Sequence, residues 1–136
     1  MRLKLGVLGV ALTGLMLAVA ACQNTPAATT NAMPKEISTS QAQNLRNAGA
    51  FILDVRQPEE WNEYHVPGST LIPLGELESR VKELPRDKQI VVVCRSGNRS
   101  ATGRDILLRA GFPQVTSLAG GLSQWKAAGY PTVTGP

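Results

Sequence analysis

Short uninterrupted apolar runs alternate with helix-like segments from Ser38 to Ala128, and this alternation limits the possible folds most strongly. Runs of this kind are expected of strands that are covered on both faces. Strands separated by helices are joined by crossover connections, which make neighbouring strands parallel. We therefore expect an α/β fold, an open parallel sheet of four or five strands with helices on both faces. The expected strands are 51–55, a short one through Leu71 and Ile72, 89–94 and 115–118.

The intervening segments carry helix start and stop signals. Ser38 and Gln41 can form a capping box before a helix over 42–48, which Gly49 would end. Pro58 in a first turn with two following acids indicates another helix start. Further helices are expected over 75–84, 101–110 and 122–128.

The length and charge of the chain limit its function. A chain of 136 residues fits one domain. Its 14 basic and 10 acidic residues give a net charge of +4, and removal of Arg2 and Lys4 with the leader described below would leave a net charge of +2. The basic residues form no run, so a nucleic-acid partner is not expected.

The first residues read as an export signal. Arg2 and Lys4 precede an uncharged apolar stretch over 5–21, and the stretch ends in Val19-Ala20-Ala21-Cys22, which resembles a bacterial lipoprotein box. The resemblance implies a signal peptide over 1–21, lipid such as palmitate on Cys22, and a flexible linker over 22–35 before a domain over 36–132. It places the protein in the bacterial cell envelope, anchored to the membrane by lipid and facing the periplasm. Gln23 favours the outer membrane, and the alternative is a plain signal peptide or an uncleaved anchor.

The cysteine count makes Cys94 informative. If Cys22 carries lipid, Cys94 has no partner in its own chain, and exported thiols normally pair as disulfides. An unpaired thiol there is either buried and inert or kept for chemistry. Cys94 follows a predicted strand, and ligands of parallel sheets bind at the carboxyl ends of strands.

The residues after Cys94 favour the chemical role. A six-residue loop, Cys94 to Arg99, is expected to join the strand to the next helix, and Gly97 allows its backbone to curl so that successive amides point inward. Such amides, the positive end of the helix and the guanidinium of Arg95 or Arg99 all favour a thiolate over a thiol. The pattern therefore predicts a nucleophile that needs no neighbouring base.

Three segments resemble the single-domain rhodaneses, the thiosulfate-type sulfurtransferases. They are "CRSGNRS", "DVRQPEEWNEYHVPGS" and "AGGLSQWKAAGYP", and the likeness covers 37–131. It implies that Cys94 attacks the outer sulfur of thiosulfate and carries it as a persulfide to cyanide or a thiol acceptor. The substrate would be held by the loop residues Arg95, Ser96, Gly97, Asn98, Arg99 and Ser100.

The same resemblance assigns supporting roles and partners. Asp54 and Arg56 would form an ion pair or hydrogen bonds that hold the loop in shape, and direct contact with the substrate is the alternative. Arg95 favours thiosulfate, because relatives that act on 3-mercaptopyruvate usually carry a small residue after the cysteine. We expect a monomer that requires no cofactor. No metal site is expected either, because no cluster of His, Cys and acidic residues has the spacing of metal ligands.

Several alternatives stay open at this stage. The protein can be a non-catalytic persulfide carrier or a sulfur-sensing binding module, or Cys94 can be an inert core thiol. A Cdc25-like phosphatase or an arsenate reductase would use Cys-x5-Arg, whereas Arg99 gives Cys-x4-Arg. Disulfide exchange ranks last, because Cys94 lacks a CxxC partner. His65, the only histidine, is expected to pack and not to catalyse.

Overall fold

The computed structural model describes residues 32–136. The predicted signal peptide, Cys22 and most of the predicted linker lie outside the described residues. Within the described part, no helix combines the length and the apolar character needed to cross a membrane.

Five parallel strands form one sheet in the order β1-β5-β4-β2-β3. This confirms the predicted α/β class. The sequence analysis did not predict the short edge strand β1, whose two residues pair with β5. The strands are β1 Glu36–Ile37, β2 Phe51–Asp54, β3 Thr70–Leu71, β4 Ile90–Val93 and β5 Val115–Leu118.

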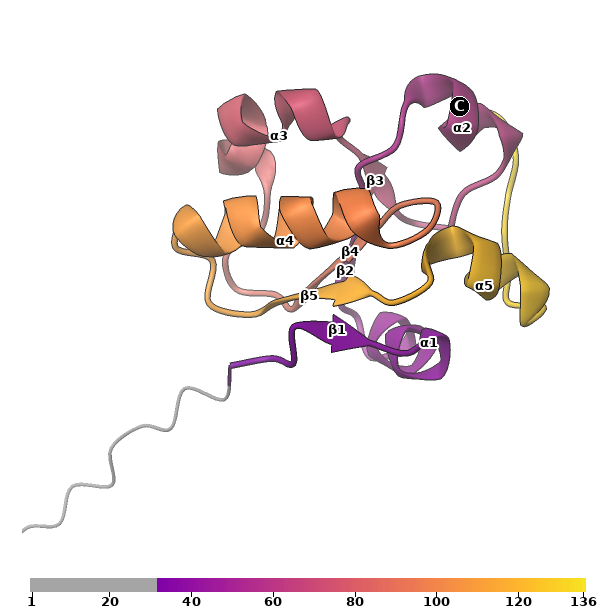
Figure 1. The fold of residues 1–136 in the computed structure, drawn as a ribbon, viewed down its shortest axis with the longest axis horizontal. Helices are drawn as coiled ribbons and strands as arrows, with labels where there is room; N and C mark the ends of the chain where they lie inside the picture. Colours follow the sequence, from indigo (N-terminus) through magenta and orange to yellow (C-terminus); the bar gives the residue numbers. More distant parts are fainter. Residues whose placement is uncertain (1–31) are drawn as a thin grey trace, which may run out of the picture.

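Helices cover both faces of the sheet (Figure 1). On one face Leu77 of α3 and Leu107 of α4 pack in a core cluster with Leu53 and Val92. On the other face, Ala42 of α1 and Trp125 of α5 pack in a second cluster. Its strand residues, such as Ile52 and Val91, alternate along the strands with those of the first cluster. The helices are α1 Thr39–Asn47, α2 Pro58–Glu63, α3 Leu74–Arg80, α4 Asn98–Arg109 and α5 Gly121–Ala127.

The predicted capping box is present at the start of α1. The Oγ atom of Ser38 accepts a hydrogen bond from the amide of Gln41 at 3.3 Å, and the Gln41 side chain accepts one from the Ser38 amide at 2.9 Å. Gly49 follows the helix at φ +96°, in the left-handed region that ends helices.

Besides α1, which begins at Thr39 and not at 42, two helices differ in extent from the prediction. The expected helix over 75–84 ends as α3 at Arg80 and continues as a 3₁₀ turn, Val81–Glu83. Pro85 disfavours helical backbone at the preceding Leu84, which is extended. The other helix, α4, begins at Asn98 and not at 101, because Gly97 adopts φ +110° and caps it. Asn98, Arg99 and Ser100 therefore form the first helical turn and do not belong to a loop.

The parallel arrangement brings the three quoted segments to one edge of the sheet. β2 ends at Asp54, β4 ends directly before Cys94, and β5 ends two residues before Gly120. Because these strands are neighbours in the sheet, their carboxyl ends lie side by side.

Candidate active site

Cys94 is the first residue after β4, and its sulfur contacts the loop that follows. The Sγ atom accepts a hydrogen bond from the Gly97 amide at 3.1 Å. As a thiol it donates to the Oγ atom of Ser100 at 3.5 Å, and that hydroxyl donates to the Gly97 carbonyl at 2.9 Å. Cys94 is 1% exposed and belongs to the core cluster beneath α4. Its sulfur nevertheless meets a polar loop, which an inert core thiol does not require.

The loop rests on the start of α5. The amides of Leu122 and Ser123 donate to the carbonyls of Cys94 and Arg95 at 2.8 and 3.1 Å. Gly121 directly precedes Leu122 and has φ +61°, and a Cβ atom there would lie 2.4 Å from the Arg95 carbonyl oxygen. The glycine pair at 120–121, expected to serve a tight turn, thus also permits close approach of two backbones.

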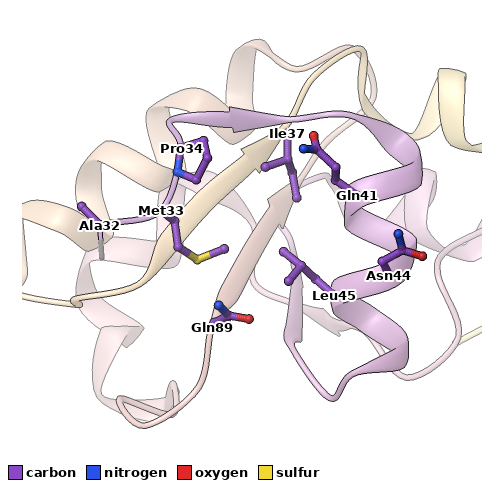
Figure 2. Close-up of a pocket in the computed structure, with 8 residues that line it drawn as sticks. All are labelled: Ala32, Met33, Pro34, Ile37, Gln41, Asn44, Leu45 and Gln89. Atoms are coloured by element: carbon purple, nitrogen blue, oxygen red, sulfur yellow. The ribbon is translucent and has the colours of Figure 1, made fainter. Parts of the chain in front are cut away.

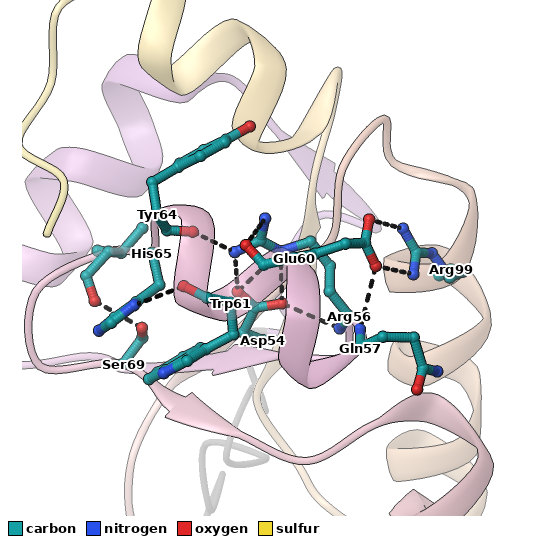
Figure 3. A network of polar contacts seen from close by, with 10 residues as sticks. Asp54, Arg56, Gln57, Glu60, Trp61, Tyr64, His65, Ser69 and Arg99 are labelled. Atoms are coloured by element: carbon teal, nitrogen blue, oxygen red, sulfur yellow. Dashed lines mark hydrogen bonds and ion pairs between the residues drawn. The ribbon is translucent and has the colours of Figure 1, made fainter. Parts of the chain in front are cut away.

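Asp54 and Arg56 form a buried ion pair, 2.8 Å between Nη2 and Oδ2 (Figure 3). The guanidinium also donates to the carbonyls of Glu60 and Tyr64, at 3.2 and 2.7 Å. These two carbonyls belong to α2 and its C-terminal cap. The pair therefore holds α2 against the end of β2, and its connection to the Cys94 loop is indirect.

Glu60 makes that connection. Its carboxylate accepts two hydrogen bonds from Arg99, at 2.7 and 2.8 Å, and a third from the Gln57 amide at 3.1 Å (Figure 3). The hydrogen bond from Arg99 lowers the pKa of Glu60 to about 2. Conversely, Glu60 raises the pKa of Arg99, and the nearby Cys94 adds to this rise. Glu60 is a site residue that the sequence analysis missed, since it was interpreted only as an acid at a helix start.

Arg95 differs from Arg99. Its side chain is exposed, and no carboxylate in residues 32–136 forms an ion pair with it. It lines a cavity of about 230 Å³ beside the loop. Ser96 of the loop and Asn98 of the first helical turn are also exposed, but they do not line this cavity. The other lining residues are Arg56, Glu60, Glu63, Tyr64 and Ser123.

His65 and the other residues considered for catalysis or metal binding do not contact Cys94. The rings of Trp61 and His65 stack with 3.6 Å between centroids, and the Nδ1 atom of His65 lies 3.0 Å from the Trp61 carbonyl oxygen. His65 therefore packs against α2. In the described residues, no three His, Cys, Asp or Glu side chains are grouped to hold a metal ion.

A larger groove of about 460 Å³ lies at the opposite edge of the sheet (Figure 2). It is lined by apolar and amide side chains, including Met33, Ile37, Leu45 and Gln89. None of its lining residues is charged or a nucleophile, so it offers no chemistry comparable to that at Cys94.

Comparisons with known proteins agree with this geometry. The model of the Rhodanese-like domain family matches residues 38–128. Thiosulfate sulfurtransferase GlpE of Pseudomonas syringae pv. syringae (strain B728a) is 37% identical over 100 residues, 74% of this chain and 93% of that protein. A sulfurtransferase of Allochromatium vinosum is 32% identical over 97 residues, which cover 71% of this chain and 91% of that protein.

A solved structure shows the same fold. The rhodanese-related protein from Thermoplasma volcanium matches with a TM-score of 0.69 and 34% identity, covering 74% of this chain and 98% of that one. The sheet, its helices and the loop after β4 thus define a rhodanese-like domain, and the chain belongs to that family. It is a sulfurtransferase of the rhodanese type.

Proposed function

We propose that the protein transfers sulfane sulfur from thiosulfate to cyanide or a thiol acceptor through a persulfide on Cys94. The observation that carries this proposal is the position of the Cys94 sulfur, at the end of β4 and hydrogen-bonded to the Gly97 amide. The name of the Pseudomonas syringae relative, a thiosulfate sulfurtransferase, supports thiosulfate as the donor.

In the first step the Cys94 thiolate attacks the outer sulfur of thiosulfate. A bond forms between the two sulfurs, the bond to the sulfonate sulfur breaks, and its electron pair leaves with sulfite. The product is an enzyme persulfide, whose terminal sulfur carries the negative charge. Backbone amides of Arg95 to Ser100 would hold that sulfur, as an oxyanion hole holds an oxygen anion.

In the second step the acceptor attacks the terminal sulfur. Cyanide takes that sulfur as thiocyanate, and the electron pair of the broken sulfur–sulfur bond restores the Cys94 thiolate. A thiol acceptor would leave as a persulfide in the same way, after losing its proton. Neither step consumes an external oxidant or reductant, so the proposed cycle requires no redox cofactor.

Intact mass measurement on the purified full chain tests this proposal. After thiosulfate treatment, we expect one added sulfur atom on Cys94, and cyanide should remove it as thiocyanate. Cys94→Ser should accept no sulfur, and equal turnover by that variant would overturn the assignment. Loading without catalytic turnover would instead favour a persulfide carrier or a sulfur-sensing module.

We also propose that lipid on Cys22 anchors the protein in the bacterial cell envelope, facing the periplasm and in the outer membrane. The support is the charged start, the apolar stretch and the small residues before Cys22. Several acyl chains anchor stably, whereas one holds only marginally. Radioactive palmitate should label the wild type and not Cys22→Ala, and absence of label from both would leave a plain signal peptide. Fractionation of the two membranes tests the outer-membrane assignment.

A further inference from the structure

The two arginines beside Cys94 are not electrically equivalent. Arg99 makes a two-point ion pair with Glu60, at 2.7 and 2.8 Å. Arg95 is exposed, and within residues 32–136 it forms no ion pair. Arg56, which lines the same cavity, is paired with Asp54. Of the three guanidinium groups at this edge, two are therefore neutralised by carboxylates.

We propose that Glu60 is a positioning residue that sets the charge of the donor site, because it neutralises Arg99 and leaves Arg95 to meet an anionic donor. The inference rests on the proposed function, since it concerns how that function's donor is bound. It adds a residue on α2, outside the cysteine loop, to the determinants of donor choice.

The geometry makes this role specific to Glu60. It is the acid of α2 that reaches the first turn of α4, while it also accepts the hydrogen bond from the Gln57 amide that caps α2. Glu60 and Arg99 are each partly buried, with side chains 25% and 34% exposed. Their charges are therefore screened less by salt than those of fully exposed pairs. The same carboxylate lines the cavity that contains Arg95.

The charge on Glu60 should affect donors in proportion to their own charge, because a Coulomb energy is proportional to both charges. Thiosulfate is a dianion, whereas an aromatic thiosulfonate is a monoanion that offers the same outer sulfur and leaves as a sulfinate. Loss of the Glu60 charge should therefore favour thiosulfate over the thiosulfonate. A loosened loop would instead affect both donors alike.

The test compares KM for thiosulfate and for benzenethiosulfonate in the full chain and its variants. At low ionic strength, Glu60→Gln should lower KM for thiosulfate about fivefold and for the thiosulfonate only about twofold, and both effects should shrink at high salt. Gln can still accept the capping hydrogen bond from Gln57. Arg99→Gln should raise KM for thiosulfate, since Glu60 is then unpaired, and adding Glu60→Gln should recover most of that loss.

Arg95→Gln should raise KM for thiosulfate about tenfold at low salt. Its matched control is Arg109→Gln, which removes the same charge from the far end of α4. A helix of 12 residues is roughly 18 Å long, and a Coulomb energy falls with distance, so the control should change KM by no more than about twofold.

Equal shifts for both donors in Glu60→Gln, or no recovery in the double variant, would overturn this inference while the proposed function stands. A wild-type chain that turns over neither donor would overturn the proposed function, and this inference with it.

Discussion

Two glycines beside Cys94 occupy positions that a larger residue would not fit. Gly97 turns the chain from the loop into α4, and its amide reaches the sulfur at 3.1 Å. Gly121 allows the carbonyl of Arg95 to approach the start of α5. Both positions have positive φ, which side chains with a Cβ atom rarely adopt.

At Gly121 we therefore expect a substitution to damage the loop. A Cβ atom would lie 2.4 Å from the Arg95 carbonyl oxygen, so Gly121→Ala must shift either the loop or α5. Persulfide loading should fall by at least about tenfold, and the free energy of unfolding by about 1–3 kcal/mol. Intact mass after a fixed exposure to thiosulfate, together with urea unfolding, measures both.

Gly49→Ala is the control for this prediction. Gly49 also has positive φ, but no atom lies within 4 Å of its added Cβ. It should lose about 1 kcal/mol of stability and keep its loading rate. Equal loading by both alanine variants would contradict the role given to the close approach.

Among the helices, α2 is held in position by a buried ion pair and not by burial of its own apolar side chains. None of its residues is buried, yet Arg56 donates to the carbonyls of Glu60 and Tyr64 while paired with Asp54. This arrangement sets the position of Glu60, which then meets Arg99.

Asp54→Asn should therefore be strongly destabilising. It leaves the buried Arg56 guanidinium without its countercharge, which costs about 3–5 kcal/mol in comparable buried pairs. Glu76→Gln, which breaks an exposed pair with Arg80, should cost far less, because exposed ion pairs contribute little to stability. Urea unfolding of the two variants compares them, and similar losses would contradict the role of the buried pair.

The pair between Glu60 and Arg99 predicts a dependence of stability on pH. The pKa of Glu60 falls from 4.5 to about 2 on folding, so the folded state binds the proton less readily than the unfolded state does. Its stabilisation is complete above pH 4.5 and is lost as the pH falls through 2. Wild type should exceed Glu60→Gln by up to about 1 kcal/mol near pH 6. Unfolding at successive pH values should show that difference disappear toward pH 2, and a constant difference would contradict it.

At the scale of the whole molecule, the first strand begins at the amino ends of the strands, whereas Cys94 lies at their carboxyl ends. The Lys35 carbonyl, just before β1, accepts hydrogen bonds from the Ser117 amide and from Arg104, each at 3.0 Å. β1 is parallel to β4, so its amino end lies away from the edge where β4 delivers Cys94.

The other terminus extends past the expected domain end at 132. Val133 forms a two-bond bridge with His65, at 2.8 and 2.9 Å, and the Gly135 amide donates to Asn62. A chain shortened to 132 should therefore lose about 1–2 kcal/mol of stability. Thermal unfolding measures this, and an unchanged midpoint would show that the bridge contributes nothing. Val133→Ala, which keeps the backbone bonds, is the control.

Several parts of this protein could be predicted from local sequence because their causes are local. Uninterrupted apolar runs specify strands covered on both faces, and Ser38 with Gln41 specifies the start of α1. Cys94 could be placed at the end of a strand because an apolar run directly precedes it and Gly97 follows three residues later.

What the tertiary structure alone decided concerns residues far apart in the chain. Thirty-nine positions separate Glu60 from Arg99, and nothing local to either predicts their pairing. β1 has only two residues, and it exists as a strand because β5 offers a free edge. The sequence by itself thus determined the class of fold and the candidate nucleophile, the Cys94 sulfur, since short-range sterics and burial act within each segment. The distribution of charge around that atom was decided by packing, because Coulomb interactions depend on distances that only the folded chain sets.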